Sequence, residues 1–583
     1  PNSNYGNRLP GGLPEVVANF EYQTLRDYYK KWYRPDLQGI IVVGDIDVDK
    51  IENRIKEMFA DITLAEDATP RTYFPVEDNI EPIVAIASDP EASNYSLMVF
   101  YKHDAIPYEA KNSLEYFLLS YITNMVTTMS NYRYQDITKQ AEPPFVYGYS
   151  YYGNYYVSPT KDAWTNVAMP KNADGIDEAM STIIKENKRI QQYGFTNSEY
   201  ERAKAEFMKN LDSQYAEREK QKNGHYVDEC LGNFLHGEPM MGIENEYAMY
   251  SQLIPNIPLE AINSFTKELI RTDNIVICLN APEIEGETLP TEEELIAIMD
   301  NANQEEVEPY EEFVSDEPIL SELPKAGSVK KQKQLDIFDA TEITLSNGIR
   351  VIIKPTDFKQ DEILMTSYSL GGTSTMSLDD ATTINVINEL STIGGLGNFS
   401  ATDLPKVLAG KKVSVTPYIG NMTYGLRGSC SPKDLETMMQ IMYLYLTDTR
   451  YDEEAFKSFI TRYQAMLENM ANDPMSTLQD SLSALLFDSH PFRASLKVDD
   501  IDEIDYKLAL KLYEQCFSNV SNFVFTFTGN INTEEFIPLA EQYLGSLPKS
   551  KGKAKYGDNV ATITSGSANC IYDKAMSTPV TTI

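Results

Sequence analysis

The feature that most constrains the fold is a long-range repeat. The stretch "GDIDVDKIENRIKEMFADI" from Gly44 to Ile62 returns as "GNINTEEFIPLAEQYLGSL" from Gly529 to Leu547, at a constant offset of 485 residues (529 − 44). Apolar positions coincide between the copies: Ile46 with Ile531, Ile51 with Phe536, Ile55 with Ala540, Phe59 with Leu544, Leu25 with Leu510, Tyr28 with Tyr513, and Trp32 with Phe517. Because solenoid repeats span only tens of residues, this period indicates duplication of a multi-domain half.

Both copies predict the same local structure. An apolar run, "GIIVVG" or "FVFTFTG", precedes the glycine and predicts a buried strand, and helical spacing of apolar residues predicts an amphipathic helix after it. Asp45, Asp47 and Asp49 are spaced like the first ligands of a calcium loop, but the sixth and twelfth positions hold Lys50 and Lys56 instead of glycine and glutamate. We therefore interpret the acidic stretch as a strand-to-helix turn, where Asp45 and Asp47, like Asn530 and Asn532 in the second copy, accept hydrogen bonds from free N–H groups at the start of the helix.

Length and charge limit the classes of protein. A chain of 583 residues predicts three or four domains. Its net charge of −37 argues against nucleic acid as a partner and disfavours anionic membranes, since we expect no basic face over such a background. No apolar run is long enough to span a bilayer. The five cysteines are far apart, odd in number, and form neither a disulfide framework nor a CxxC site.

Strand and helix patterns alternate and predict an α+β fold, with tandem two-layer domains and mostly antiparallel sheets. Strands are expected at "NYSLMVFY", "PFVYGYSYYGNYY" and "EILMTSYSL", and a tight hairpin at Asn347-Gly348. Helices are expected around residues 108–130, 175–193, 197–222, 380–393, 432–447 and 452–471.

The sequence pattern and local composition divide the chain into predicted domains and one acidic linker. We expect residues 1–65 to be the C-terminal part of a first domain, 75–280 a second domain, 281–324 an acidic linker, 325–550 a third domain, and 560–583 the start of a truncated fourth domain. No Lys or Arg occurs between Arg271 and Lys325. This composition predicts a solvated hinge, with one helix at "TEEELIAIMDNA".

Two stretches resemble the insulinase/pitrilysin family of zinc peptidases. They are "LSNGIRVIIKPTD", with the strand and "GG" that follow it, and "SNYGNRLPGGLPEVVANFEYQTLRDYYKKWYRPDLQGIIVVGDID". The resemblance implies two homologous halves of two domains each, closing like a clamshell. It also implies a zinc metalloendopeptidase of the bacterial two-halves-in-one-chain type, which hydrolyses peptides or unfolded polypeptides enclosed between its halves. The family binds zinc with His-x-x-Glu-His and a distant glutamate.

This sequence departs from that pattern. Its four histidines are His103, His225, His236 and His490, and no two are four residues apart. In the second half, Val386-Ile387-Asn388-Glu389-Leu390 stands where the motif would be, so Glu389 is retained as a helix-surface carboxylate without its two imidazoles. We therefore predict no catalytic residue and no metal ligand in this fragment, with zinc only in the intact protein. The substrate-binding residues and the oligomeric state cannot be deduced from the sequence.

Other candidate sites have ordinary explanations. "GGLGNF" from Gly394 to Phe399 lacks the Gly-Lys-Ser/Thr ending of a phosphate loop and predicts a turn after a helix. The alternating tyrosines of "YGYSYYGNYY" predict a half-exposed strand, with aromatic contacts to a peptide as the functional alternative. His225 and His236 are interpreted as surface or packing residues.

Two alternatives to the peptidase remain open. One is a non-catalytic structural or chaperone-like member of the same family, and the other is an unrelated tyrosine-rich binding protein. Family resemblance favours the bacterial periplasm or envelope as the location, with the cytoplasm as the alternative.

Overall fold

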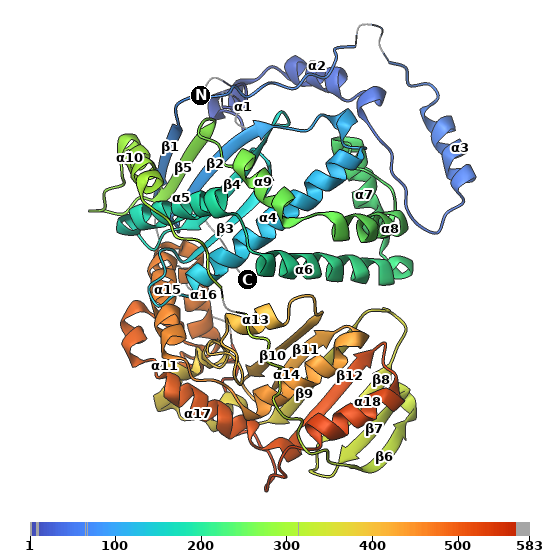
Figure 1. The fold of residues 1–583 in the computed structure, drawn as a ribbon, viewed down its shortest axis with the longest axis vertical. Helices are drawn as coiled ribbons and strands as arrows, with labels where there is room; N and C mark the ends of the chain where they lie inside the picture. Colours follow the sequence, from blue (N-terminus) through green and yellow to red (C-terminus); the bar gives the residue numbers. More distant parts are fainter. Residues whose placement is uncertain are drawn as a thin grey trace.

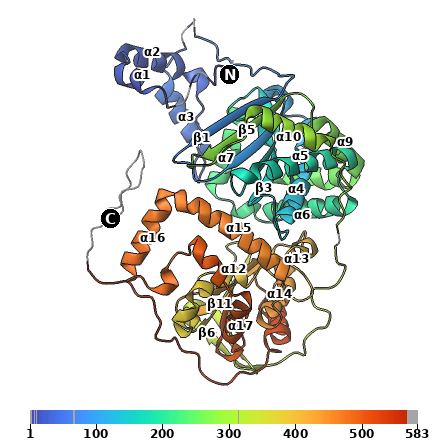
Figure 2. The same cartoon turned by 90° about the vertical axis from the view of Figure 1, so that its left-hand side faces the viewer.

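The computed structural model describes residues 3–566 except positions 7, 9, 10, 65, 67 and 313. Two bodies, each a sheet covered by helices, lie one above the other (Figure 1). We call residues 79–312 the first body and residues 325–561 the second body. Residues 11–64 form an N-terminal arm along the first body (Figure 2). Most of the predicted fourth-domain segment, 560–583, lies outside the described residues.

The first body is built around a five-stranded sheet of order β1-β5-β2-β4-β3. Its elements are β1 (Ile83–Asp89), β2 (Ser96–Asp104), α4 (Leu114–Thr138), β3 (Tyr147–Asn154), β4 (Lys161–Met169), α5 (Ile176–Tyr193), α6 (Asn197–Ala216), α7 (Asn223–His236), α8 (Ile243–Leu253), α9 (Leu259–Leu269), β5 (Ile275–Pro282) and α10 (Glu292–Gln304). The helices predicted around 108–130, 175–193 and 197–222 are confirmed as α4, α5 and α6.

The second body is built around a seven-stranded sheet of order β10-β11-β9-β12-β8-β7-β6. Its elements are β6 (Val329–Leu335), β7 (Ala340–Leu345), β8 (Arg350–Pro355), β9 (Ile363–Leu370), α11 (Ala381–Ile384), α12 (Ile387–Leu390), α13 (Asp403–Val407), β10 (Val413–Ile419), β11 (Thr423–Cys430), α14 (Leu435–Thr447), α15 (Glu453–Asn472), α16 (Pro474–Leu486), α17 (Tyr506–Phe517), β12 (Val524–Gly529) and α18 (Thr533–Leu539). The helix predicted over 380–393 is broken into the short α11 and α12, whereas α14 and α15 confirm the other two.

The two bodies share one topology. In each, the last strand lies between two strands that are consecutive in the chain: β5 between β1 and β2, and β12 between β8 and β9. Each inserted strand is parallel to one neighbour and antiparallel to the other, and all other neighbours are antiparallel. The predicted α+β class with mostly antiparallel sheets is confirmed, with one parallel pair in each sheet.

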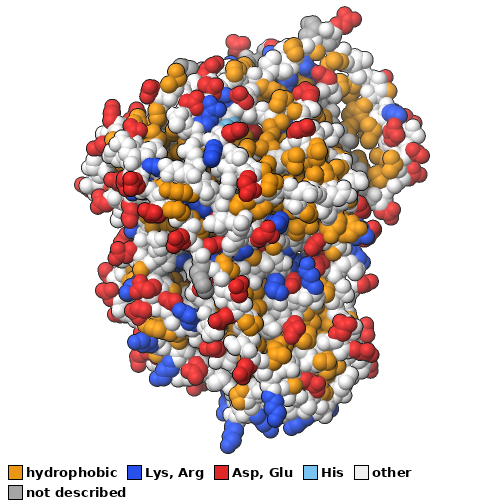
Figure 3. All heavy atoms as spheres, in the orientation of Figure 1, with side chains coloured by type: hydrophobic (Ala, Val, Ile, Leu, Met, Phe, Trp, Pro, Cys, Tyr) orange, Lys and Arg blue, Asp and Glu red, His pale blue; other side chains and the backbone are white. Residues whose placement is uncertain are grey.

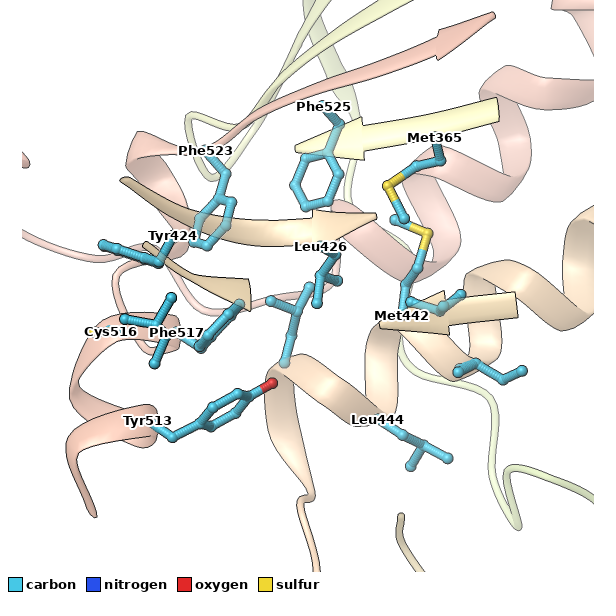
Figure 4. Close-up of a cluster of buried hydrophobic side chains, with 14 of the residues drawn as sticks. Met365, Tyr424, Leu426, Met442, Leu444, Tyr513, Cys516, Phe517, Phe523 and Phe525 are labelled. Atoms are coloured by element: carbon cyan, nitrogen blue, oxygen red, sulfur yellow. The ribbon is translucent and has the colours of Figure 1, made fainter. Parts of the chain in front are cut away.

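The cores follow the strand periodicity. In β9, buried and exposed residues alternate along the whole strand, as expected of a sheet with one covered face. Figure 4 shows the side chains of Met365 of β9 and Met442 of α14 directed toward each other, with Leu426 of β11 and Phe525 of β12 in the same cluster. Burial of these large apolar side chains between sheet and helices supplies the main stabilisation of this body.

The predicted hairpin at Asn347-Gly348 is confirmed and ties the body together. Gly348 has φ +102°, a left-handed conformation that favours glycine. The buried Asn347 amide donates to the carbonyls of Leu544, at 2.8 Å, and Leu547, at 3.0 Å. The turn between β7 and β8 thereby fixes the chain that follows α18.

The acidic segment 281–324 contains the predicted helix, α10, but its first part is not a solvated linker. Leu295, Met299 and Ala302 are buried in the core of the first body. By topology, α10 follows β5 as α18 follows β12, so it is the last helix of a domain. The expectation of a fully solvated segment is wrong because it considered only the charges of the segment itself.

Cations from α4, α5 and α6 hold the rest of this stretch. Arg202 pairs with Glu312 at 2.7 Å, and Arg189 donates to the carbonyl of Glu308 at 2.9 Å. The buried Arg133 guanidinium stacks on Tyr310, 4.3 Å from the ring centre. The acidic segment therefore docks on basic side chains that are distant in sequence.

The N-terminal arm contains α1 (Pro14–Asn19), α2 (Tyr22–Trp32) and α3 (Val48–Phe59), and none of these helices has a buried residue. The helix entry at Asp47 is confirmed, since its side chain accepts from the Lys50 N–H at 3.0 Å. The strand predicted at 39–44 is wrong: this stretch carries no strand and runs alongside α7, with Gly39 beside the Phe234 ring. No described strand pairs with it.

Candidate functional site

The stretch predicted to stand in place of the family's zinc motif, Val386 to Leu390, lies in the second body at α12 and the residue before it. Val386, Ile387 and Leu390 are buried in the apolar core, whereas Glu389 is exposed, as predicted for a helix-surface carboxylate. Asn388 points to the sheet edge: its amide donates to the Ile419 carbonyl at 3.2 Å and accepts from the Ile419 N–H at 2.7 Å. Aliphatic side chains supply no ligand atoms, so these residues do not fit a zinc ion.

The four histidines have separate local roles. His103 of β2 lies 2.9 Å from the Leu269 carbonyl, and burial lowers its pKa. His225 faces Glu229 on α7 at 3.9 Å, and His236 is in the last turn of the same helix. His490 accepts from the Phe492 N–H at 3.2 Å. In the described part of the chain, no three His, Cys, Asp or Glu side chains gather to hold a metal.

The glycine-rich stretch from Gly394 to Phe399 is a packed turn, as predicted. Gly395 has φ +91°, and a side chain there would meet the Phe399 carbonyl at 2.2 Å. Leu396 bridges to Phe399 and to Thr449. The stretch closes on its own backbone and leaves no cradle for a phosphate.

The tyrosine-rich stretch forms β3, an edge strand of the first body. Tyr147, Tyr149 and Tyr151 are exposed on one face and stack on one another, with ring centres 6.1 Å apart in both pairs. The half-exposed strand is confirmed. A flat aromatic stripe on an edge strand can contact apolar and aromatic side chains of a peptide.

A polar pocket of about 380 Å³ adjoins this stripe, between α4 and the end of β3. Its wall includes two carboxylates, Asp162 of β4 and Glu238 after α7. Lys111 pairs with Glu238 at 2.7 Å, and the Tyr116 hydroxyl donates to the same carboxylate. Burial raises the pKa of Asp162, Lys111 opposes that rise, and Glu238 adds to it.

The pocket has the chemistry of a site for a cationic or hydrogen-bonding group. Only Lys111 is a cation in its lining, against the two carboxylates, while Ser120, Thr123 and Asn124 of α4 add neutral polar atoms. Sequence reasoning missed Asp162 and Glu238 because 76 residues separate them (238 − 162). The sequence feature that could have indicated Asp162 is the β3–β4 hairpin, because its pairing places Asp162 opposite Asn154 of the tyrosine-rich strand.

The two bodies meet through polar contacts. Lys406 pairs with Asp136 at 2.9 Å, and Asp136 also accepts from the Tyr310 hydroxyl at 2.9 Å. Lys412 donates to Ser213 at 2.7 Å and pairs with Asp361 at 3.0 Å. Of these contacts, the Lys406–Asp136 ion pair and the Lys412–Ser213 hydrogen bond cross from one body to the other. None of the described helices combines the length and apolarity needed to cross a bilayer.

Comparison with known proteins now gives the family. The model of the Peptidase M16 inactive domain matches residues 19–207 and 503–582. The Arabidopsis thaliana protein "Zinc protease PQQL-like" is 24% identical over 94% of this chain and 51% of its own length. The "Probable zinc protease PqqL" of Escherichia coli is 20% identical over 97% of this chain and 60% of its own length. The chain thus spans roughly half to three fifths of these relatives.

The fold is likewise that of a solved relative. The structure of the ferredoxin protease FusC, in complex with Arabidopsis ferredoxin, superposes with a TM-score of 0.60 at 16% identity. It covers 96% of this chain and 61% of the FusC chain. The long-range repeat, the two bodies of one topology and these matches lead to one conclusion: the chain belongs to the M16 peptidase family, the insulinase/pitrilysin family, and is PqqL-like.

Proposed function

We propose that this chain is the non-catalytic part of a zinc metalloendopeptidase that hydrolyses peptides or unfolded polypeptides enclosed between its two halves. The observation that carries the proposal is the motif position of the second body, where Val386 and Leu390 are core residues in place of the two histidine ligands. The relatives named zinc proteases support the activity of the intact protein, whose zinc would activate a water molecule. This chain by itself is expected to be inactive.

Within that protein, the chain's role is to bind and enclose substrate. The exposed tyrosines of β3 and the Asp162–Glu238 pocket offer a peptide an aromatic stripe beside an acidic recess. In this proposal the bodies separate to admit substrate, and the Lys406–Asp136 ion pair and the Lys412–Ser213 hydrogen bond between them break when they do. FusC is a ferredoxin protease, so a small folded protein is a second substrate class to test.

The proposed domain plan follows from the topology. Residues 1–65 would complete a catalytic-type domain, the first body would be its inactive neighbour, and the second body an inactive copy of the catalytic type. The relative PqqL of Escherichia coli is described as periplasmic, and we propose an envelope location for this protein as well.

Photo-crosslinking tests the substrate-binding role. A photoreactive phenylalanine analogue replaces Tyr149 in the full chain, and a matched control carries it at Tyr193, which is also exposed but lies at the end of α5. An unfolded peptide should be captured at position 149 severalfold more than at 193, and free unlabelled peptide should compete. Equal capture at both positions would reject this surface as the binding site.

Zinc analysis of the purified chain and the coding sequence upstream of Pro1 distinguish the peptidase from the structural or chaperone-like alternative. We expect below about one tenth of a zinc ion per purified chain and no chelator-sensitive hydrolysis, because the aliphatic motif position lacks ligands. Reading the coding sequence upstream of Pro1 then decides the activity. A His-x-x-Glu-His there supports the peptidase, and its absence favours the structural or chaperone-like alternative.

A further inference from the structure

Two lysine-rich segments interrupt the acidic background of this chain. Residues 325–335 and 545–557 each contain four lysines and no carboxylate, in a protein with 87 acidic and 50 basic residues. The lysines are Lys325, Lys330, Lys331, Lys333, Lys549, Lys551, Lys553 and Lys555. Such segments form a basic surface only if the fold places them together.

Hydrogen bonds around the Asn347 turn do place them together. Ser328 and Ser346 bond to each other, so the start of β6 lies against the turn. On the other side, the Ser521 hydroxyl donates to the Asn347 carbonyl at 2.6 Å, and the Ser521 N–H donates to Ser550 at 2.9 Å. Segments whose first residues are 220 positions apart (545 − 325) therefore share one end of the second body, which we call the basic end.

The lysines of the basic end are exposed, and none of the eight makes an ion pair within the described residues. Figure 3 shows Lys and Arg side chains gathered at the lower end of the molecule, where Figure 1 places β6 and β7. The nearest cross-strand carboxylate, Glu342 opposite Lys333, is paired with Arg350 at 2.8 Å. The expectation that no basic face could form is therefore wrong, because the charge is segregated.

The shape and the residue types indicate which anion fits. β6 is the outer strand of its sheet and exposes lysines along its length, which gives an extended surface without a pocket. The segments contain lysine without arginine, so they offer mobile point charges and lack the bidentate forks that recognise single phosphates or bases. At the β6–β7 turn, Ile337 is 93% exposed and Phe338 is 64% exposed, between Asp336 and Asp339.

We propose that the basic end is a docking surface for an anionic lipid bilayer. Clusters of four to eight lysines attract anionic headgroups, and exposed apolar side chains beside them can enter the interfacial region. The acidic remainder of the chain is repelled by the same surface, which would orient the molecule with the basic end toward the bilayer. The inference is independent of peptidase activity.

Vesicle sedimentation with the full chain tests the proposal. The probes are vesicles of phosphatidylcholine with and without 30 mol% phosphatidylglycerol, at low salt and in 0.5 M NaCl. We expect binding only with the anionic lipid, and loss of binding at high salt, since screening shortens the range of charge attraction. Equal binding to the neutral vesicles would overturn the proposal.

A charge-matched pair of variants assigns the surface. The test variant changes Lys330, Lys331, Lys333, Lys549, Lys551 and Lys553 to Gln. The control changes six other exposed lysines to Gln: Lys30, Lys31, Lys50, Lys220, Lys222 and Lys267. The test variant should lose about tenfold or more in vesicle affinity and the control less than about threefold, because only lysines at the bilayer surface contribute. Equal losses would overturn the assignment.

A third variant distinguishes a bilayer from a soluble polyanion. Ile337→Ser with Phe338→Ser preserves every charge and should weaken binding to anionic vesicles while leaving binding to heparin unchanged. If the wild-type chain binds heparin or an oligonucleotide but not the vesicles, the basic end is a polyanion site and the membrane proposal fails.

Discussion

The N-terminal arm and the end of the second body have the same elements at the same spacing, yet only one of them is packed. Adding 485 to the bounds of α2, 22–32, gives 507–517, which lies within α17 at 506–517. The 3-10 turn at Pro35–Leu37 becomes Val520–Asn522, and α3 at 48–59 becomes 533–544, the span of α18 and its final turn. Only the strand has no counterpart.

Residues at equivalent positions of the two copies differ in burial, although the apolar pattern of the two copies is the same. Tyr513 is 2% exposed and its counterpart Tyr28 is 59% exposed; Leu544 is fully buried and its counterpart Phe59 is 44% exposed. In the second body these residues pack on β12 and α14 in one core. The arm has no sheet beneath it among the described residues. The helical pattern is thus encoded by nearby residues, whereas a strand and a core require partners from elsewhere in the chain.

The largest expected difference is in hydrogen exchange. Amides of residues 524–529 should exchange at least about a thousandfold more slowly than those of 39–44, since central-strand amides open only with the whole domain. β12 bonds to β8 and β9 on its two sides, whereas 39–44 has no strand partner among the described residues. Mass spectrometry of peptides covering both stretches measures this. Similar protection of the two stretches would show that residues 39–44 pair with a β-sheet in solution.

Truncating equivalent core positions should give the next largest difference. Phe536→Ala should destabilise the second body by about 3–5 kcal/mol, because the fully buried ring leaves a cavity. Ile51→Ala, at the same place in the repeat, should change stability by less than about 0.5 kcal/mol. Urea unfolding followed by circular dichroism compares the two. A loss of several kcal/mol at Ile51 would mean that the arm is packed in solution.

The same contrast explains how much of the fold was predictable. The helix α3 followed from apolar spacing and its capping residue Asp47, which are local signals. The strand at 39–44 and the solvated state of 281–324 were mispredicted because both depend on distant groups. For the acidic segment these groups are Arg133, Arg189 and Arg202, which lie on α4, α5 and α6.

The sequence predicted the lack of zinc ligands better than it predicted the residues of the candidate binding pocket. One short stretch predicts that Val386 and Leu390 stand in place of the family's histidines, and the structure adds that both are core residues. The Asp162–Glu238 pocket could not be read, since its walls come from α4, the hairpin and the loop after α7. The basic end was missed for the same reason, because net charge carries no information on where the charges lie.

The smallest expected difference in stability concerns the N-cap residues of α3 and α18. It tests the contribution of a helix cap separately from that of core packing. Asn532 accepts from the Glu534 N–H at 3.0 Å, as Asp47 accepts from the Lys50 N–H at 3.0 Å. Asn532→Ala should destabilise the second body by about 1 kcal/mol, since a helix N–H loses its acceptor. Asp47→Ala should lower the helicity of α3 and leave the unfolding midpoint of the second body unchanged, because α3 has no buried residue.

The exchange variants Asp47→Asn and Asn532→Asp are the matched controls: each keeps an acceptor oxygen, so each should retain its helix. Circular dichroism of an isolated peptide of residues 44–62, together with urea unfolding of the full chain, measures the two effects separately. If Asp47→Ala shifted the second-body midpoint as much as Asn532→Ala, the arm would be coupled to the core, and the division between local helix and partner-dependent packing would fail.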